Sequence, residues 1–180
     1  MAALVQVVLL IANAGTTFFT ILLLMRFFMQ LVRAPFDSPI GSFVLNLTNW
    51  LVLPLRRIVP AIRGFDSASL LAAYLLQTLL LALAISLSSS HQLASVGSML
   101  RIAVDGLFVL VRVSVYLYVI LLIAQAMLSW FNPHAPLNRL VGQMTAPVLR
   151  PLQRIVPPIS GIDLTPLIAI LLAQIILIFV

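Results

Sequence analysis

Four long apolar stretches dominate this chain of 180 residues and restrict what it can fold into. Each approaches the roughly 20 residues that a helix needs to cross a hydrocarbon core of about 30 Å. The predicted spans are residues 4–32, 68–87, 113–131 and 164–180. The last span is short, and a trimmed C-terminus is one explanation. The pattern predicts an all-α integral membrane protein with four transmembrane helices.

The composition excludes most other classes of protein. Hydrophobic residues make up 63% of the chain and charged residues only 8%, whereas soluble domains carry about 25% charged residues. A soluble enzyme and a disordered chain are therefore excluded. The basic residues are all arginine, and the net charge of +6 is expected to meet lipid phosphates, not nucleic acid. The chain has no cysteine, and its two histidines, His91 and His134, fall in predicted loops, so we expect no metal site and no cofactor. No signal peptide of the usual form is expected at the N-terminus.

A segment rich in proline and arginine occurs twice, 97 residues apart. Residues 54–66 read PLRRIVPAIRGFD and residues 151–163 read PLQRIVPPISGID. Without a gap, 13 of the 25 positions from 54 to 78 are identical to those 97 residues later. Biased composition matches leucines by chance, but it does not align prolines, a glycine, an arginine and an aspartate. The sequence therefore predicts a tandem repeat, whose structural motif positions are Pro54, Pro60, Gly64 and Asp66 in the first copy and Pro151, Pro157, Gly161 and Asp163 in the second.

Each half is predicted to be a helical hairpin, with residues 1–97 as the first repeat and residues 98–180 as the second. Two spans per repeat give both copies the same orientation, as in parallel repeats. The first and third connections carry eight of the ten arginines if Arg26, expected to extend to the interface, is counted. The positive-inside rule then places both basic connections in the cytoplasm and both termini outside. The alternative is that several of these arginines report lipid contact and not orientation.

An amphipathic stretch precedes each copy of the motif, over residues 40–54 and 137–149. Apolar residues recur there at spacings of three and four, as on one face of a helix. Both stretches are too short and too polar to span, so each is predicted to be an interfacial helix that Pro54 or Pro151 ends. The arginines here are predicted to bind anionic lipid headgroups, with a docking surface for a protein partner or an arginine-lined substrate site as alternatives. The candidates are Arg56, Arg57, Arg63, Arg139, Arg150 and Arg154.

Asp66 and Asp163 occupy equivalent positions, directly before a predicted span. Aspartate is a preferred N-cap residue, because its carboxylate accepts hydrogen bonds from the free backbone N–H groups of the first turn. A catalytic or ion-coordinating role is the alternative. Neither aspartate has a serine, histidine or lysine in register between the copies, as acid–base chemistry would need. We therefore predict that both are helix caps.

Some polar residues fall within or beside the spans. Gln77 and Gln174 lie mid-span at equivalent positions, where hydrogen bonds between helices are expected and a selectivity element is the alternative. Arg101, Asp105 and Arg112 share one helical face. They are predicted to form a polar stripe on an interfacial helix that leads into the third span, or else a charged cluster along a conduction path.

With these residues in place, the chain resembles a known family. The doubled motif over residues 54–66 and 151–167, together with Leu47-Thr48 and the ending Leu128-Ser129-Trp130-Phe131, is similar to the YggT family of small bacterial membrane proteins. Gln153 departs from the motif, which usually has a basic residue there. The resemblance implies a multi-pass inner-membrane protein without an agreed activity. Family members are linked to osmotic-stress tolerance, to cell division or nucleoid organisation and, in plastid relatives, to haem attachment.

We predict a non-enzymatic scaffold or assembly factor whose basic cytoplasmic face binds lipid or recruits a membrane or cytoplasmic protein partner. The alternative is a small ion channel or transporter in osmotic response. Because the spans carry so little charge, that alternative would require a homo-oligomer to line a pore. No hydrolase, metalloprotease or phosphatidyl-transfer motif is present in the sequence, so we do not expect an enzyme.

Overall fold

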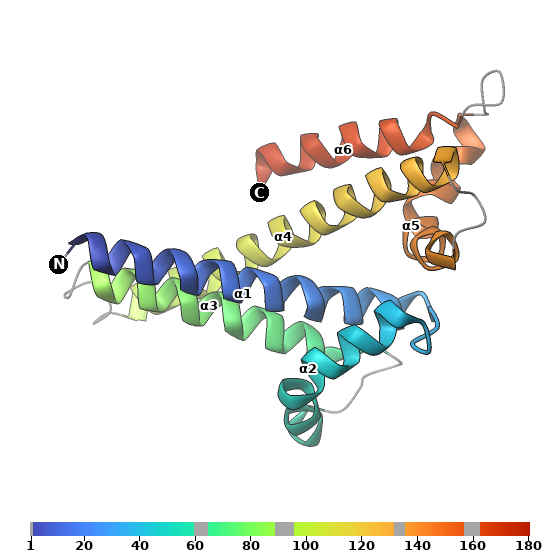
Figure 1. Cartoon of the computed structure of the whole chain (residues 1–180). Coiled ribbons are helices and arrows are strands. Elements are labelled where there is room, and N and C mark those ends of the chain that lie inside the picture. Colours follow the sequence, from blue (N-terminus) through green and yellow to red (C-terminus); the bar gives the residue numbers. More distant parts are fainter. Residues whose placement is uncertain (1, 60–64, 89–95, 132–135, 157–162) are drawn as a thin grey trace.

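The computed structural model describes residues 2–59, 65–88, 96–131, 136–156 and 163–180, which fold into six α-helices (Figure 1). The helices are α1 (Ala2–Leu31), α2 (Pro39–Ile58), α3 (Ser67–Ser88), α4 (Val96–Phe131), α5 (Pro136–Ile155) and α6 (Thr165–Phe179). Three of these six contain stretches long and apolar enough to cross a membrane, at Ala3–Leu31, Ser67–Leu87 and Gly97–Ser129. The all-α prediction is confirmed.

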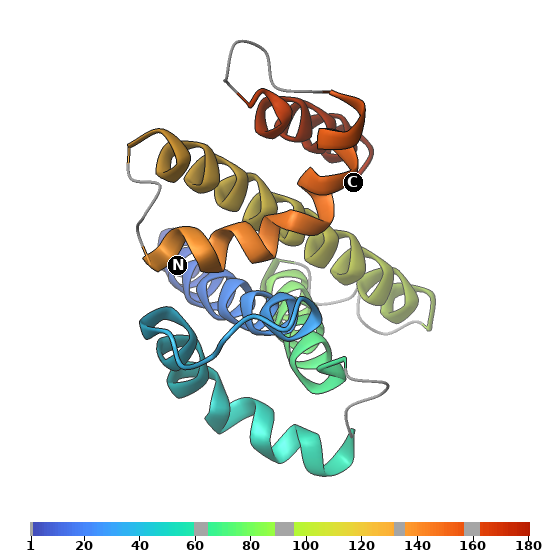
Figure 2. The same cartoon turned by 90° about the vertical axis from the view of Figure 1, so that its right-hand side faces the viewer.

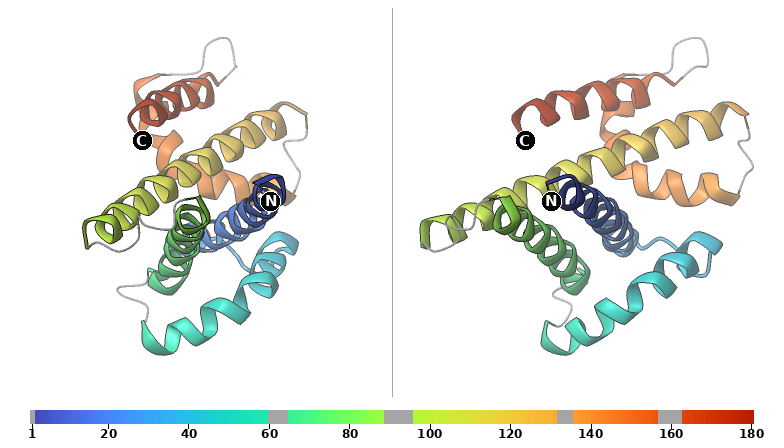
Figure 3. Two further views of the ribbon diagram at one scale, coloured as in Figure 1. Left: turned by 90° about the vertical axis from the view of Figure 1, so that its left-hand side faces the viewer. Right: turned by 60° about the vertical axis from the view of Figure 1, so that its left-hand side comes forward.

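The third predicted span, residues 113–131, and the polar stripe that leads into it belong to one helix. In the structure α4 is one unbroken helix of 36 residues, and it runs across the whole molecule in Figure 3. The charged side chains Arg101, Asp105 and Arg112 lie exposed on this helix. Three charges on exposed positions do not interrupt a helix whose other residues are almost all apolar.

The fourth apolar helix is shorter than the other three. Helix α6 has 15 residues, about 22 Å of helix at 1.5 Å per residue. That is less than the roughly 30 Å of a hydrocarbon core. Its sequence is the most uniformly apolar of the six helices, broken only by Thr165, Pro166 and Gln174.

Helices α2 and α5 lie at the same end of the molecule. Figure 1 shows both at the right-hand end, away from the N-terminus, and Figure 2 looks onto that end. They begin 97 residues apart, end 97 residues apart and are both 20 residues long. This is the offset at which the proline–arginine motif recurs in the sequence.

A tight reversal joins α1 to α2. Ala34 N donates to Met29 O at 2.8 Å and Arg33 N to Gln30 O at 3.1 Å, the paired bonds of a Schellman ending. Arg33 takes the left-handed conformation there, with φ of 54°. Ser38 then caps α2 by accepting a hydrogen bond from Gly41 N at 3.1 Å. The reversal turns α2 back against the end of α1.

The prediction that Pro54 and Pro151 end the two amphipathic helices is wrong. Helix α2 continues through Pro54 to Ile58, and α5 continues through Pro147 and Pro151 to Ile155. A proline within a helix removes one backbone hydrogen bond and kinks the axis, but the bonds on either side still hold. The basic residues that follow Pro54 and Pro151 therefore remain on helices.

Buried apolar side chains form a core shared by the five helices α1 to α5, including Leu23, Ala72, Leu121 and Met144. A smaller cluster joins α6 to α4 and α5 through Leu122, Leu149 and Ala169. The buried face of α2 consists of Gly41, Val44, Thr48 and Val52, so this face packs against protein and not lipid. Helix α2 is thus held on the bundle as part of its core.

Candidate functional site

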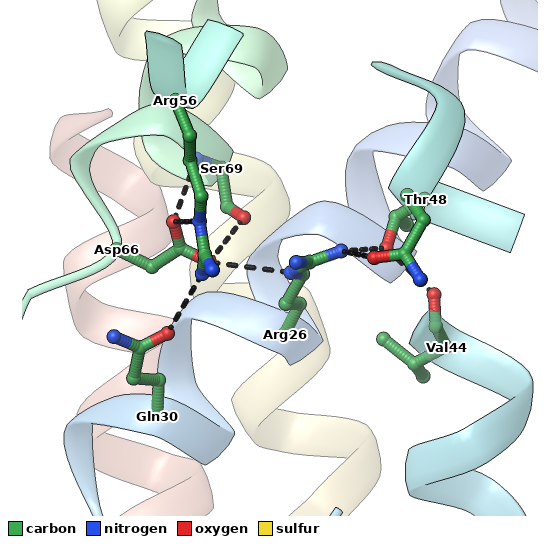
Figure 4. Close-up of polar contacts among 8 residues, drawn as sticks. Arg26, Gln30, Val44, Thr48, Arg56, Asp66 and Ser69 are labelled. Atoms are coloured by element: carbon green, nitrogen blue, oxygen red, sulfur yellow. Dashed lines mark hydrogen bonds and ion pairs between the residues drawn. The ribbon is translucent and has the colours of Figure 1, made fainter. Parts of the chain in front are cut away.

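A cluster of charged side chains is buried where α1, α2 and α3 meet (Figure 4). Asp66, directly before α3, is 1% exposed. Its Oδ2 accepts hydrogen bonds from Ser69 Oγ at 2.6 Å and from Arg56 at 2.8 Å. Its Oδ1 accepts from the backbone N of Ser69 at 3.4 Å. Asp66 therefore caps α3 as predicted, and it also carries ion pairs that the sequence analysis did not foresee.

Arg26 reaches this aspartate from α1. Its Nε donates to Asp66 Oδ2 at 3.2 Å, while one terminal nitrogen donates to Thr48 Oγ1 at 2.8 Å and to Asn49 Oδ1 at 2.9 Å. Arg26 is only 2% exposed. The expectation that it extends to the interface is wrong, because its Nε and one terminal nitrogen bind acceptors on α2 and before α3 inside the protein. Arg26 thereby connects three helices.

Arg56, near the end of α2, is the second cation of the cluster. It forms the shorter of the two ion pairs with Asp66 and donates to Gln30 Oε1 at 3.2 Å. Its side chain is 36% exposed, against 3% for Arg26. Arg56 was predicted to bind lipid or a partner, and in the structure several of its donors are used inside the protein.

The surroundings of Asp66 favour its ionised form. Burial by itself would raise the pKa of Asp66, but hydrogen bonds from Arg56 and Ser69 and the charges of Arg56 and Arg26 outweigh burial. The pKa of Asp66 is therefore below its ordinary value of 3.8. The buried carboxylate of Asp66 forms ion pairs with arginines of α1 and α2 and so holds these helices against the start of α3. It is poorly placed as a general base, because its acceptor positions are occupied.

The lowered pKa of Asp66 gives a prediction for stability against pH. A carboxyl group with a depressed pKa contributes stability above its unfolded pKa and loses it as pH falls through the folded value. We expect the difference in unfolding free energy between the wild type and Asp66→Asn to be constant from pH 7 to about pH 5 and to shrink below about pH 4. Detergent-solubilised protein, unfolded with SDS at each pH, provides the measurement. A difference that grows on acidification would contradict this assignment.

The equivalent position in the second half is simpler. Asp163 Oδ1 accepts from the backbone N and Oγ1 of Thr165 at 2.9 and 2.6 Å, and Oδ2 accepts from Gln153 at 2.9 Å. Burial would raise the pKa of Asp163, but the hydrogen bonds from Thr165 and Gln153 lower it overall. Gln153 stands where the first half has Arg56, and Ile123 stands where it has Arg26. The N-cap residue of α6 is Leu164, so the prediction that Asp163 caps this helix is wrong by one residue. Asp163 bonds the first residue of the helix from one position earlier, without an ion pair among the described residues.

The two mid-span glutamines differ in their surroundings. Gln77 is 4% exposed, and its Nε2 donates to Thr20 Oγ1 at 3.0 Å, joining α3 to α1. This is the interhelical bond that the sequence predicts. Gln174 lies exposed on α6. Arg112, the last of the polar stripe, donates to the backbone oxygen of Val180 at 2.6 Å.

Most of the other candidate arginines are exposed. Arg57, Arg139, Arg150 and Arg154 lie exposed on α2 or α5, at the end of the molecule seen in Figure 2. Of the remaining predicted positions, Pro60, Arg63, Gly64, Pro157 and Gly161, together with His91 and His134, lie outside the described residues. Among the described residues, no cluster of three histidine, aspartate or glutamate side chains could hold a metal ion.

Sequence reasoning missed the partners that complete the cluster. They are Thr48, Asn49, Gln30 and Ser69. One signal was available, since Arg26 is a lone cation inside an otherwise apolar stretch. Such a charge inside a span is expected to pair with a buried partner of opposite sign. Only four acidic residues exist in the chain, and Asp66 is one of them.

The long apolar helices and the arginines gathered at one end define a helical membrane protein. The family model described as CCB3/YggT matches residues 1–87 and 104–180, and the chain belongs to this family. It is 34% identical to "Uncharacterized protein YggT" of Escherichia coli K12 over 160 residues, which cover 88% of this chain and 80% of the relative. It is 31% identical to "Uncharacterized protein PA0392" of Pseudomonas aeruginosa, with the same coverage. No solved structure matches it.

Proposed function

We propose that this chain is a non-enzymatic scaffold or assembly factor of the bacterial inner membrane. Its working surface is the end of the molecule formed by α2 and α5. The observation that carries the proposal is the placement of both amphipathic helices at one end, with Arg57, Arg139, Arg150 and Arg154 exposed there. The partner is a membrane or cytoplasmic protein with an acidic surface, because charge complementarity steers and orients such contacts.

The arginines fall into a buried set and an exposed set, and this difference supports the proposal. The arginines of the buried cluster bind Asp66 and hold α2 against α1 and α3. On α2 and α5, the described arginines outside the cluster are exposed. An anchored interfacial helix presents its charges in a fixed arrangement, which lowers the entropy lost on binding. A catalytic site would instead need an accessible nucleophile or base.

The proposal also includes the arrangement of the helices in the membrane. We take the chain as two parallel repeats, each with an apolar hairpin and an interfacial helix, with α6 as the fourth span. The shared offset of 97 residues between α2 and α5 supports the repeat. Both basic connections then face the cytoplasm and both termini face outward. A scaffold is compatible with the processes linked to the family by resemblance, namely osmotic tolerance, cell division and cofactor assembly.

Two buried polar pairs among the described residues give the channel alternative no support. The buried polar pair Thr20 and Gln77 is closed by its own hydrogen bond. The buried charges Arg26 and Asp66 are paired with each other. A pathway for ions would need polar groups that remain free to coordinate them.

Photo-crosslinking in native membranes tests the docking role. A photoreactive residue at Leu53, which is 54% exposed on α2, should capture one specific protein. Replacing both Arg57 and Arg139 by glutamine should lower that capture about tenfold, which corresponds to about 1.4 kcal/mol from two exposed charges. The matched control replaces Arg101 and Arg112 by glutamine. These substitutions remove the same charge from α4 and should leave capture unchanged. Equal capture by both double variants would contradict the proposal.

A further inference from the structure

A groove of about 760 Å³ lies between the end of α1, the middle of α4 and the second half of α5. Arg150 and Arg154 line it from α5, one helical turn apart. Of the described residues that line the groove, none is acidic. The site therefore combines two unneutralised cations with a cavity large enough for part of a ligand.

The rest of the lining is apolar or offers hydrogen-bond acceptors. Leu31 and Val32 form the wall from α1, and Tyr118 lies on α4. Gln143 Oε1 is buried and has no hydrogen-bond partner, so it remains available to a donor. Such an unpaired buried atom costs free energy unless a ligand or water satisfies it.

The prolines of α5 add acceptors beside the arginines. Pro147 and Pro151 both line the groove, and neither has an N–H to donate. The carbonyl oxygens of residues 143 and 147 therefore cannot receive the usual helical bond from the residue four positions later. The groove thus presents cations and acceptors together, next to apolar walls.

We propose that this groove binds an anionic glycerophospholipid whose headgroup carries hydroxyl groups. The guanidinium groups of Arg150 and Arg154 bind the phosphate through charge-assisted hydrogen bonds. The headgroup hydroxyls donate to Gln143 Oε1 and the freed carbonyl oxygens. The apolar walls from α1 and α5 contact the acyl chains. A lipid is the occupant because the groove opens beside the end of a membrane-length helix, where Leu31 is 42% exposed.

Native mass spectrometry of the purified full chain in detergent tests this inference, with dioleoyl phosphatidylglycerol as the probe. The wild type should retain this lipid more tightly than dioleoyl phosphatidylcholine, which has no headgroup donor. Replacing both Arg150 and Arg154 by glutamine should weaken phosphatidylglycerol binding about 30-fold, corresponding to about 1 kcal/mol for each arginine. The Arg101→Gln and Arg112→Gln double variant removes equal charge outside the groove and should bind as the wild type does.

A second variant fills the groove without changing charge. Ala146 lines it from α5, and Ala146→Trp should also weaken lipid binding. Equal loss in both arginine double variants would overturn the proposal, and so would full binding by Ala146→Trp. Displacement of the lipid by excess inorganic phosphate would assign the groove to a free anion and overturn it as well. The inference rests on the membrane placement in the proposed function but not on a protein partner, so failure of partner capture leaves the lipid result interpretable.

Discussion

Asp66→Asn should destabilise the protein by about 3–5 kcal/mol, because it leaves the buried Arg26 without its counter-charge. Arg26 is 2% exposed and cannot turn to water without moving α1 or α2. Arg56 is less affected, since its side chain is 36% exposed. The measurement is the free energy of unfolding in mixed micelles, obtained by SDS titration of the full chain.

Asp163→Asn is the matched control. Asp163 sits at the equivalent position but pairs with Gln153 and Thr165, with no arginine at hydrogen-bonding distance among the described contacts. Its loss should cost about 1 kcal/mol, as for ordinary hydrogen bonds that are partly exposed to solvent. Similar losses at Asp66 and Asp163 would mean that hydrogen bonds to the start of the helix, and not the ion pair, account for the stability at both sites.

A double variant separates the buried charge from the cap. Adding Arg26→Met to Asp66→Asn removes the cation that the first change leaves unpaired. The double variant should be more stable than Asp66→Asn alone, since replacing a buried ion pair by apolar groups is far less costly than breaking it. If the two changes are simply additive, Arg26 and Asp66 are not energetically coupled.

Gly106→Ala should destabilise the packing of α4 on α3 by about 1–3 kcal/mol. A Cβ at position 106 would overlap Cγ2 of Thr78 on α3. The methyl group cannot easily rotate away, because Thr78 Oγ1 bonds the backbone oxygens of Tyr74 and Leu75 at 2.9 and 3.1 Å. The helices must therefore separate or the threonine must lose its bonds. SDS titration again gives the free energy of unfolding.

Thr78→Ser provides the compensating change, because it removes the methyl group and keeps the hydroxyl. The Gly106→Ala and Thr78→Ser double variant should recover most of the lost stability. Gly15→Ala on α1 is the control, since a Cβ there meets nothing within 4 Å, and it should not destabilise. If Thr78→Ser does not restore stability, the loss of unfolding free energy in Gly106→Ala does not come from the contact with the Thr78 methyl group.

The sequence predicts the helices well and their interactions less well. The apolar stretches identify α1, α3, α4 and α6, and the spacing of apolar residues identifies α2 and α5. The three charged side chains before the third predicted span lie on the same helix, α4, as the span itself. Their spacing puts them on one helical face, where they leave the apolar faces intact.

The buried cluster could not be predicted from the sequence for a different physical reason. Arg26, Thr48 and Asp66 are separated by 22 and 18 residues in sequence, and a local pattern carries no information on which helices meet. The repeat also misdirected the inference. It suggested one role for Asp66 and Asp163. The first half has Arg26 and Arg56 to pair with its aspartate, whereas the second half has Ile123 and Gln153 at the equivalent positions. Comparing the two copies position by position would have marked Arg26 as the difference.

We propose that α2 and α5 present their arginines at the cytoplasmic face of the membrane. The chain contains no cysteine, so single cysteines can be introduced at Arg57, at Arg154 and, as a control at the opposite end, at Met99, which is 65% exposed. A membrane-impermeant maleimide applied to intact cells should label only the position 99 variant, and permeabilisation should expose the other two. Labelling of position 57 or 154 from outside, separately or together, would contradict the account.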